Sequence, residues 1–368
     1  MKSLCFILLL ILMALPASAA SRQPEAIRVA IVKGAEQVKL DGGGLLATDE
    51  QRLPLRLTFP AVVKRSKDLI SVNGRNVSSL VVAAAGIVQV NGKGYRGLIE
   101  VYPGEKGLLV INELPLEEYL VGLINCEISS LWPIEAVKAQ AVIARSYAFY
   151  QKDARKYALY HLESSVLDQV YEGVDIEDSR AVRGVRETAG EVLTFGGRVI
   201  QAFYHANCGG HTEAAENVWG TAIPYLCGVE CAYCTTVPSV RWEQTLPLKK
   251  LESLLRGGGY QVSGLQDIRA GKSNASGRVR DLTLVASKGS QTISAVNFRK
   301  AIGYSVIKST NFDIRTFGDD LLFTGFGSGH GVGLCQWGAK QRASEGFSYR
   351  EILDYYYPGV RLERLYGS

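Results

Sequence analysis

The chain has 368 residues, a formal net charge of +5 at pH 7 and 47% hydrophobic residues. This length accommodates two domains, or one elaborated domain, with ample apolar material for a core. The net charge is small and no long basic run occurs, so the sequence argues against nucleic-acid binding and supports only a weak preference for anionic partners.

The N-terminus has the pattern of a secretory signal. Lys2 supplies a positive start, residues 4–15 are apolar, and residues 16–19 have the small side chains of a cleavage site. The apolar run is too short to span a membrane as a helix, and no other segment is long enough. We therefore expect a signal peptide at residues 1–19, export to the periplasm or cell envelope, and no transmembrane anchor after cleavage.

Residues 27–110 combine strand-like alternation with hairpin signals. The segments 88–90 and 98–101 flank a glycine-rich turn that starts with Asn-Gly at 91–92, and a second Asn-Gly pair stands at 73–74. No residue pattern in this region indicates chemistry. We expect it to form a small β-rich N-terminal domain.

Residues 111–364 mix helix and strand signals. Pro115 and Pro133 each suit the start of a helix, and apolar residues recur at three- and four-residue steps after Pro133. Ser348 and Glu351 match a capping box ahead of a further helix. The predicted fold class is therefore α+β, with the β-rich domain followed by a mixed helix and strand catalytic domain at 111–364.

Glu127 is the strongest candidate for chemistry. It is a lone carboxylate among Ile124, Ile128, Leu131 and Trp132. Burial in such surroundings disfavours the charged form and raises the pKa of a carboxyl, which can then act as a general acid near neutral pH. The alternative is an exposed or helix-capping glutamate.

A glycine-rich segment at 325–333 has glycine at every second position and carries His330. Glycine allows unusual backbone angles and close approach of the backbone to a ligand. The alternative is a flexible turn. The spacing fits neither a dinucleotide-binding nor a P-loop pattern, so a nucleotide site is not expected.

Seven segments together resemble the stage II sporulation protein D / LytB family. They occur in the family's order over roughly residues 111 to 362. The matching segments are 114–120, Glu127, 135–148, 169–173, 208–212, 329–339 and 355–359.

This resemblance implies cleavage of cell-wall glycan by a lytic transglycosylase, or enhancement of a wall amidase in the LytB branch. The family's catalytic glutamate corresponds to Glu127. A transglycosylase needs only one carboxyl group, because the sugar's own 6-hydroxyl replaces water as the nucleophile. Glu135 is interpreted as a charge at the start of a helix rather than as a second catalytic group.

Further residues are candidates for contacting the glycan and for holding Glu127. For two of them, Lys138 and Arg145, the alternative is a solvated helix face. The complete set is Lys138, Arg145, His330, Gly331 and Gln336.

The chain departs from some relatives in its metal ligands. Those relatives hold zinc through histidines and cysteines just before the Gln-Val-Tyr motif, where this chain offers only His161 and no cysteine. That zinc site is therefore not expected, and catalysis should require no cofactor. A different group has zinc-like spacing, and disulfides are the default for it in an oxidising compartment, with structural zinc as the alternative. Its members are His205, Cys208, His211, Cys227, Cys231 and Cys234.

The two remaining cysteines of the mature chain are Cys126 and Cys335. Cys126 precedes Glu127, and Cys335 lies in the second signature segment. If both segments line one cleft, a disulfide between them is expected. The alternative is two separate buried thiols.

We therefore predict an exported peptidoglycan lytic transglycosylase that leaves anhydro-muramyl ends. The family resemblance implies that its substrate is glycan strands lacking stem peptides. One rival is a non-catalytic glycan-binding enhancer of a cell-wall amidase, which would make that amidase a partner. The other is a zinc hydrolase built from the cluster between His205 and Cys234. Nucleic acid is not an expected partner.

Overall fold

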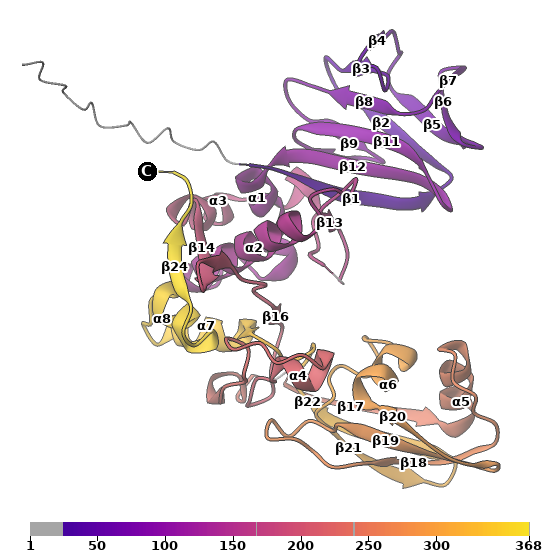
Figure 1. Ribbon diagram of the computed structural model, residues 1–368, viewed down its shortest axis with the longest axis vertical. Helices are drawn as coiled ribbons and strands as arrows, with labels where there is room; N and C mark the ends of the chain where they lie inside the picture. Colours follow the sequence, from indigo (N-terminus) through magenta and orange to yellow (C-terminus); the bar gives the residue numbers. More distant parts are fainter. Residues whose placement is uncertain (1–24, 167, 238–239, 368) are drawn as a thin grey trace, which may run out of the picture.

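The computed structural model describes residues 25–166, 168–237 and 240–367. The expected signal peptide at 1–19 lies outside these residues. Figure 1 shows a β-rich lobe formed by the N-terminal part, a central body, and a third lobe formed by residues from the second half of the chain. Among the described residues, no helix is both long and apolar enough to cross a membrane.

The N-terminal lobe consists of two sheets packed on each other. A seven-stranded sheet has the order β13-β1-β12-β11-β8-β3-β4, and a six-stranded sheet has the order β10-β9-β2-β5-β6-β7. Alternate residues of both sheets point into one core, as expected for stacked sheets. The strands are β1 (Ala26–Ala35), β2 (Gln37–Asp41), β3 (Leu46–Thr48), β4 (Pro54–Leu55), β5 (Ala61–Ser66), β6 (Leu69–Val72), β7 (Arg75–Val77), β8 (Leu80–Ala83), β9 (Val88–Val90), β10 (Lys93–Tyr95), β11 (Leu98–Gly104), β12 (Gly107–Pro115) and β13 (Leu162–Glu163).

Both Asn-Gly turns form, with positive φ at Asn73 and Asn91 and at the glycine after each. The first joins β6 to β7 as expected. The second joins β9 to β10. The expected pairing of 88–90 with 98–101 is wrong, because β11 pairs with β8 and β12 in the other sheet.

The central body is built around two helices and is closed by the C-terminal segment. Buried residues of α1 and α2 belong to the same hydrophobic cluster as the N-terminal lobe, and the other face of α2 packs on a second cluster with the C-terminal helices. Both prolines lie one position before their helices, as N-caps. The expected capping box forms at Ser348. The elements are α1 (Leu116–Glu127), α2 (Ile134–Ala154), η1 (Gly173–Ile176), α3 (Ser179–Glu187), β14 (Glu191–Phe195), β15 (Arg198–Val199), β16 (Tyr204–His205), α4 (Ala215–Trp219), η2 (Ala232–Cys234), β23 (Leu334–Cys335), α7 (Gln336–Ser344), α8 (Tyr349–Tyr356) and β24 (Arg361–Arg364).

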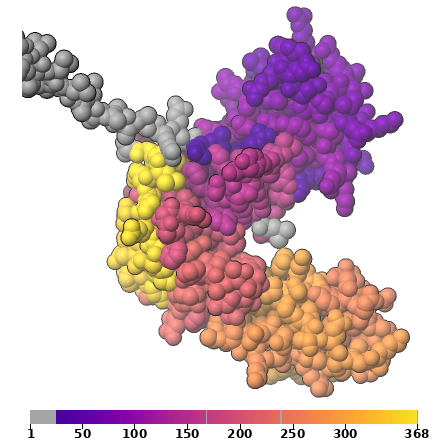
Figure 2. Space-filling view, viewed as in Figure 1, coloured from indigo at the N-terminus to yellow at the C-terminus, as the bar shows by residue number. Residues whose placement is uncertain are grey.

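The third lobe, residues 241–326, is inserted between η2 and β23. It has its own hydrophobic cluster and two three-stranded sheets, β17-β22-β21 and β18-β19-β20. Figure 2 shows it as a separate mass beside the central body. Its elements are β17 (Arg241–Pro247), α5 (Leu248–Gly257), β18 (Leu265–Ala270), β19 (Asp281–Ala286), β20 (Gly289–Ser294), α6 (Ala295–Ile302), β21 (Phe312–Phe317) and β22 (Asp320–Phe326).

The α+β fold class is confirmed by the eight α-helices and the sheets of the described residues. The division into domains at 27–110 and 111–364 stays a prediction. The structure adds that the second of these segments contains two hydrophobic clusters of its own, one in the central body and one in the inserted lobe.

Candidate active site

Glu127 is the last residue of α1, and Ile128 ends the helix with extended backbone. Residue Glu127 is partly exposed. One carboxylate oxygen accepts a hydrogen bond from the Val170 backbone N–H at 3.2 Å. The side chains of Tyr204 and Gln336 also hydrogen-bond to this carboxylate. Three segments distant in sequence therefore converge on one carboxyl group.

The surroundings of Glu127 act on its pKa in opposite directions. Burial raises the pKa above the ordinary value of 4.5, whereas the hydrogen bonds from Tyr204, Val170 and Gln336 stabilise the anion and lower it. Burial prevails, so the pKa of Glu127 is raised. A carboxyl group with a raised pKa on a partly exposed residue can give a proton to a bound ligand and take one back.

A chain of hydrogen bonds orients the Tyr204 hydroxyl. The Tyr119 hydroxyl donates to the Gln169 carbonyl oxygen at 3.1 Å, and the Gln169 amide donates to the Tyr204 oxygen at 3.3 Å. Because the Tyr204 oxygen accepts from Gln169, its own proton is free to point at Glu127. Burial, and next the charge of Glu127, hold the pKa of both tyrosines well above 10, so both remain donors.

Gln336 is the first residue of α7 and is almost completely buried. Its side-chain amide donates to the Gln140 carbonyl oxygen on α2 at 3.2 Å. The preceding strand β23 pairs in parallel with β16, with Leu334 opposite Tyr204 and Cys335 opposite the next residue. This short parallel pair brings Tyr204 and Gln336 to the same place.

His330 lies in the glycine-rich segment next to Tyr204. Its Nδ1 accepts the Val332 N–H at 3.1 Å, and its ring also hydrogen-bonds to the Tyr204 backbone. Burial lowers the pKa of His330 to about 4, so the imidazole is neutral near pH 7. Trp219 packs on this ring with centroids 5.3 Å apart. His330 is therefore held beside Tyr204 by these contacts.

Positive φ angles and close packing explain why glycine occupies two positions of this segment. Gly331 has φ +87°, and a Cβ at this position would lie 2.6 Å from the guanidinium of Arg278. Gly329 has φ +107°, and its Cβ would lie 2.7 Å from the Cβ of His205. Gly331 is buried, so its place in the site is set by packing against Arg278.

Two candidate residues of α2 are not brought to Glu127 by any contact among the described residues. Lys138 forms ion pairs with Glu135 at 2.9 Å and with Glu187 at 2.7 Å. Arg145 is completely buried and pairs with Glu117 at 2.7 Å. Arg145 is therefore not on a solvated face, and its contacts fit a structural role in the core.

The expected disulfide between Cys126 and Cys335 is wrong. The Cys335 sulfur lies within 4.8 Å of the sulfurs of Cys208, Cys231 and Cys234, and all six described cysteines are free thiols. The Cys126 sulfur instead faces the Gly122 carbonyl of its own helix at 4.0 Å. Successive helical side chains point about 100° apart, so the neighbour of a residue that faces Gln336 need not face Cys335.

The histidines expected near these cysteines have other partners. His205 Nδ1 hydrogen-bonds to the Val332 carbonyl at 3.1 Å, and His211 Nδ1 to the Thr212 carbonyl. Cys227 is exposed and lies outside the sulfur cluster. Of the six residues expected to cluster, three do so, and Cys335 is the fourth member.

Comparison with known proteins finds two matching family models and several relatives. A family model described as stage II sporulation protein matches residues 104–195, and a model described as a domain of unknown function matches residues 233–333. An uncharacterized protein of Brachyspira hyodysenteriae is 35% identical over 78% of this chain and 79% of its own length. The amidase enhancer of Bacillus subtilis is 29% identical over 66% of this chain and 40% of its own length. Stage II sporulation protein D of the same organism is 26% identical over 68% of this chain and 75% of its own length.

The chain belongs to the SpoIID/LytB family. The residues that match the SpoIID model contain α1, α2 and the segment around Gln169. The match therefore includes Glu127. The domain of unknown function coincides with the inserted lobe and the glycine-rich segment.

Three residues around Glu127 were not predicted from the sequence. Tyr204 stands directly before His205, which was noted only as a metal ligand, and Tyr119 lies in a segment used only for the resemblance. Gln140 lies on α2, where it is buried and accepts a hydrogen bond from Gln336. A buried tyrosine or glutamine has no sequence signal that distinguishes it from an exposed one.

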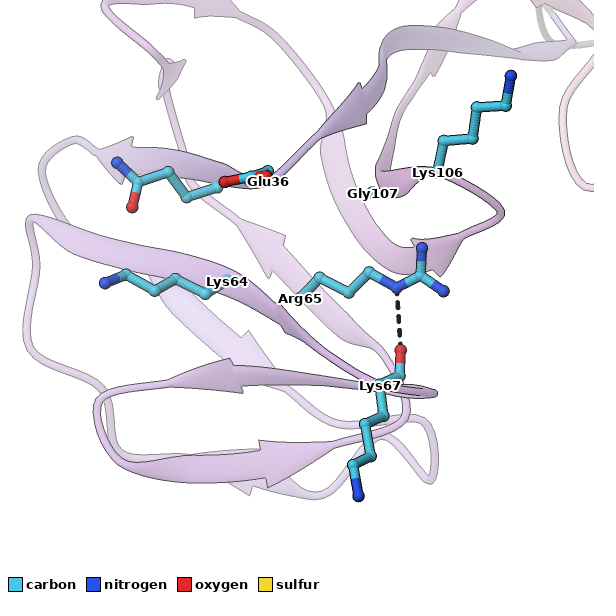
Figure 3. A pocket seen from close by; sticks show the side chains of 7 residues that line it. Glu36, Lys64, Arg65, Lys67, Lys106 and Gly107 are labelled. Atoms are coloured by element: carbon cyan, nitrogen blue, oxygen red, sulfur yellow. Dashed lines mark hydrogen bonds between the residues drawn. The ribbon is translucent and has the colours of Figure 1, made fainter.

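Figure 3 shows a hollow that is separate from the site. It is lined by Glu36, Lys64, Arg65, Lys67 and Lys106 at the turns of the N-terminal lobe, and Arg65 donates to the Lys67 carbonyl at 3.0 Å. It shares no residue with the surroundings of Glu127. The hollow is open, and no catalytic arrangement is present among the residues that line it.

Proposed function

We propose that this SpoIID/LytB protein is an exported lytic transglycosylase that cleaves the glycan strands of peptidoglycan. The observation that carries the proposal is a single carboxyl group on a partly exposed residue, Glu127; burial raises the pKa of this group, and three hydrogen-bond donors hold it in place. None of its hydrogen-bonding partners among the described residues is a carboxylate. One such group is what this reaction needs, whereas a hydrolase needs two.

In the proposed reaction, Glu127 first donates its proton to the glycosidic oxygen. The bond between that oxygen and the sugar's C1 then breaks. The Glu127 carboxylate next removes the proton of the 6-hydroxyl of the same sugar, and that oxygen bonds to C1 and closes an anhydro ring. The proton returns to Glu127, and no water is consumed.

The neighbours of Glu127 are positioning residues in this proposal. Tyr204 and Gln336 stabilise the carboxylate in the interval between giving up one proton and taking the next. His330, neutral and adjacent to Tyr204, is proposed to contact the glycan. Arg145 is left out because it is completely buried, and Lys138 keeps only a peripheral role because two glutamates already bind it.

The second candidate function is a non-catalytic enhancer of a cell-wall amidase. It is favoured by the relative named amidase enhancer, which aligns with 66% of this chain. An enhancer would bind glycan without releasing anhydro-muramyl products, and Glu127 would then serve in binding alone.

The test is digestion of glycan strands with and without stem peptides, with products identified by mass spectrometry. The wild type should release anhydro-muramyl ends, and Glu127→Gln should lower the rate at least ~10²-fold by removing a general acid. Glu135→Gln is the matched control, because Glu135 lies in the first turn of α2 and pairs with Lys138 instead of lining the site. An amidase assay with the same proteins tests the enhancer function.

A further inference from the structure

Four buried cysteine sulfurs meet at one point in the central body. The side chains are completely buried, and the four sulfur atoms all lie within 4.8 Å of one another. The sulfurs of Cys208 and Cys234 are 3.3 Å apart. The proposed reaction uses none of them. The four residues are Cys208, Cys231, Cys234 and Cys335.

The arrangement has the dimensions of a tetrahedral metal site. A zinc ion bound at about 2.3 Å by four thiolates sets the sulfurs about 3.8 Å apart. Cys231 and Cys234 have the Cys-x-x-Cys spacing that suits two ligands of one ion. The cluster draws Cys208 from the loop after β16 and Cys335 from the end of β23, so ligands from three separate segments converge.

The polar groups around the sulfurs suit thiolates. The backbone N–H groups of Cys208 and Gly338 donate to the Cys335 sulfur at 3.3 and 3.4 Å. The Tyr356 hydroxyl lies 3.1 Å from the Cys231 sulfur. Donors of this kind are the outer contacts that orient and stabilise metal-bound thiolates.

A buried cation lies beside the cluster. Arg278, from the inserted lobe, donates to the carbonyl oxygens of Cys208 at 2.7 Å and His211 at 2.9 Å. It interacts electrostatically with Glu213 and with cysteines of the cluster. A zinc ion with four thiolates carries two net negative charges, so a neighbouring guanidinium stabilises it in this dry environment.

We infer that Cys208, Cys231, Cys234 and Cys335 together bind one structural zinc ion. Zinc replaces the four thiol protons, which pass to solvent, and is then held by four thiolates. All four positions are filled by protein, so the ion has no open site for substrate or water and serves structure instead of hydrolysis.

The location of the ion indicates which parts of the structure it would hold together. Cys335 is the N-cap of α7, and the next residue, Gln336, hydrogen-bonds to Glu127. The Cys231 and Cys234 segment leads directly into the inserted lobe. Zinc would therefore fix the start of α7 at Glu127 and also anchor that lobe. The metal site itself does not depend on the proposed reaction.

The test is the metal content of the exported full chain, purified with zinc present, by native mass spectrometry. We expect one zinc ion per chain, and cobalt substitution should give the absorption of a tetrahedral thiolate site. Cys335→Ser and Cys231→Ser should each lose the zinc. Cys227→Ser is the matched control, because Cys227 lies in the same region but is exposed, and it should keep the zinc.

The wild-type measurement decides the matter even where a cysteine variant fails to fold. Peptide mapping that finds two disulfides among the four residues would overturn the inference, as would four free thiols in a chain that holds no zinc. Zinc retained by Cys335→Ser but lost from Cys227→Ser would also overturn it. Because the readout is metal content, its failure is distinguishable from a failure to cleave glycan.

Discussion

The Glu127 site and the four-sulfur cluster are adjacent, since Gln336 belongs to the first and Cys335 to the second, but they are built in opposite ways. Glu127 is a single ionisable group, partly exposed and surrounded by neutral donors. The cluster gathers four ionisable groups with no exposed surface. The two sites differ in their exposure to solvent. A group that both solvent and ligand can reach can exchange protons, whereas an enclosed set of thiols is suited to holding an ion.

The largest effect that we expect is on zinc binding, from a substitution of Arg278. Arg278→Met should weaken zinc binding about 10- to 100-fold, the usual cost of losing an outer contact of a metal site. Zinc affinity is measured by competition with a chelator. Arg299→Met is the control, because Arg299 is a partly buried arginine of the same lobe that donates instead to the Ile307 carbonyl. Equal zinc affinity in the two variants would contradict the role of Arg278.

A smaller effect is expected at Tyr204. Tyr204→Phe removes a donor to the Glu127 carboxylate, and activity should fall about 10-fold, as a hydrogen bond to a charged group contributes about 1.5 kcal/mol or more. Loss of the donor destabilises the anion and raises the pKa of Glu127 further. The basic limb of the pH profile of kcat/KM, which reports loss of the acid's proton, should therefore move to higher pH.

The control for that shift is Tyr119→Phe. Tyr119 acts on Tyr204 only through Gln169, so its effect on the profile should be the smaller of the two. A basic limb that stays in place in Tyr204→Phe, or moves to lower pH, would show that Tyr204 does not stabilise the Glu127 anion.

The smallest effect concerns stability. The folded protein raises the pKa of Glu127 above 4.5, so the stability linked to its protonated form is fully present below pH 4.5 and is lost as the pH rises through the folded pKa. Glu127→Gln cannot ionise and avoids this loss. The variant should therefore melt at a higher temperature than the wild type at pH 7, with the difference narrowing toward pH 4.

Thermal unfolding of both proteins across this pH range checks the sign. A variant that is less stable than the wild type at pH 7, with a difference that grows as the pH rises, would mean that hydrogen bonds to the Glu127 anion outweigh its burial.

Local patterns predicted local structure well. The turn at Asn73 and the capping box at Ser348 need only residues close in sequence, and both formed. The pairing expected for residues 98–101 failed because the choice of a strand's partner depends on which sheet it joins. Burial of Arg145 was not predicted because its counter-ion, Glu117, lies on another helix.

In the candidate site, too, contacts between distant segments were harder to predict than local features. Glu127 and Gln336 were predicted from segments that match a family, and the structure brings them into contact. Cys335 was assigned to Cys126, because adjacency in sequence to two contacting residues suggested adjacency in space. The Cys126 side chain leaves α1 in a different direction from that of Glu127. Cys335 instead lies with Cys208, Cys231 and Cys234.

In the proposed reaction, Glu127 is first the acid and then the base, and no water is consumed. The most direct measurement is mass spectrometry of the products that wild type and Glu127→Gln release from glycan strands in water enriched in oxygen-18. We expect anhydro-muramyl ends without the heavy isotope from the wild type, and a rate at least ~10²-fold lower from the variant. Reducing ends that carry oxygen-18, or near-normal anhydro products from Glu127→Gln, would contradict it.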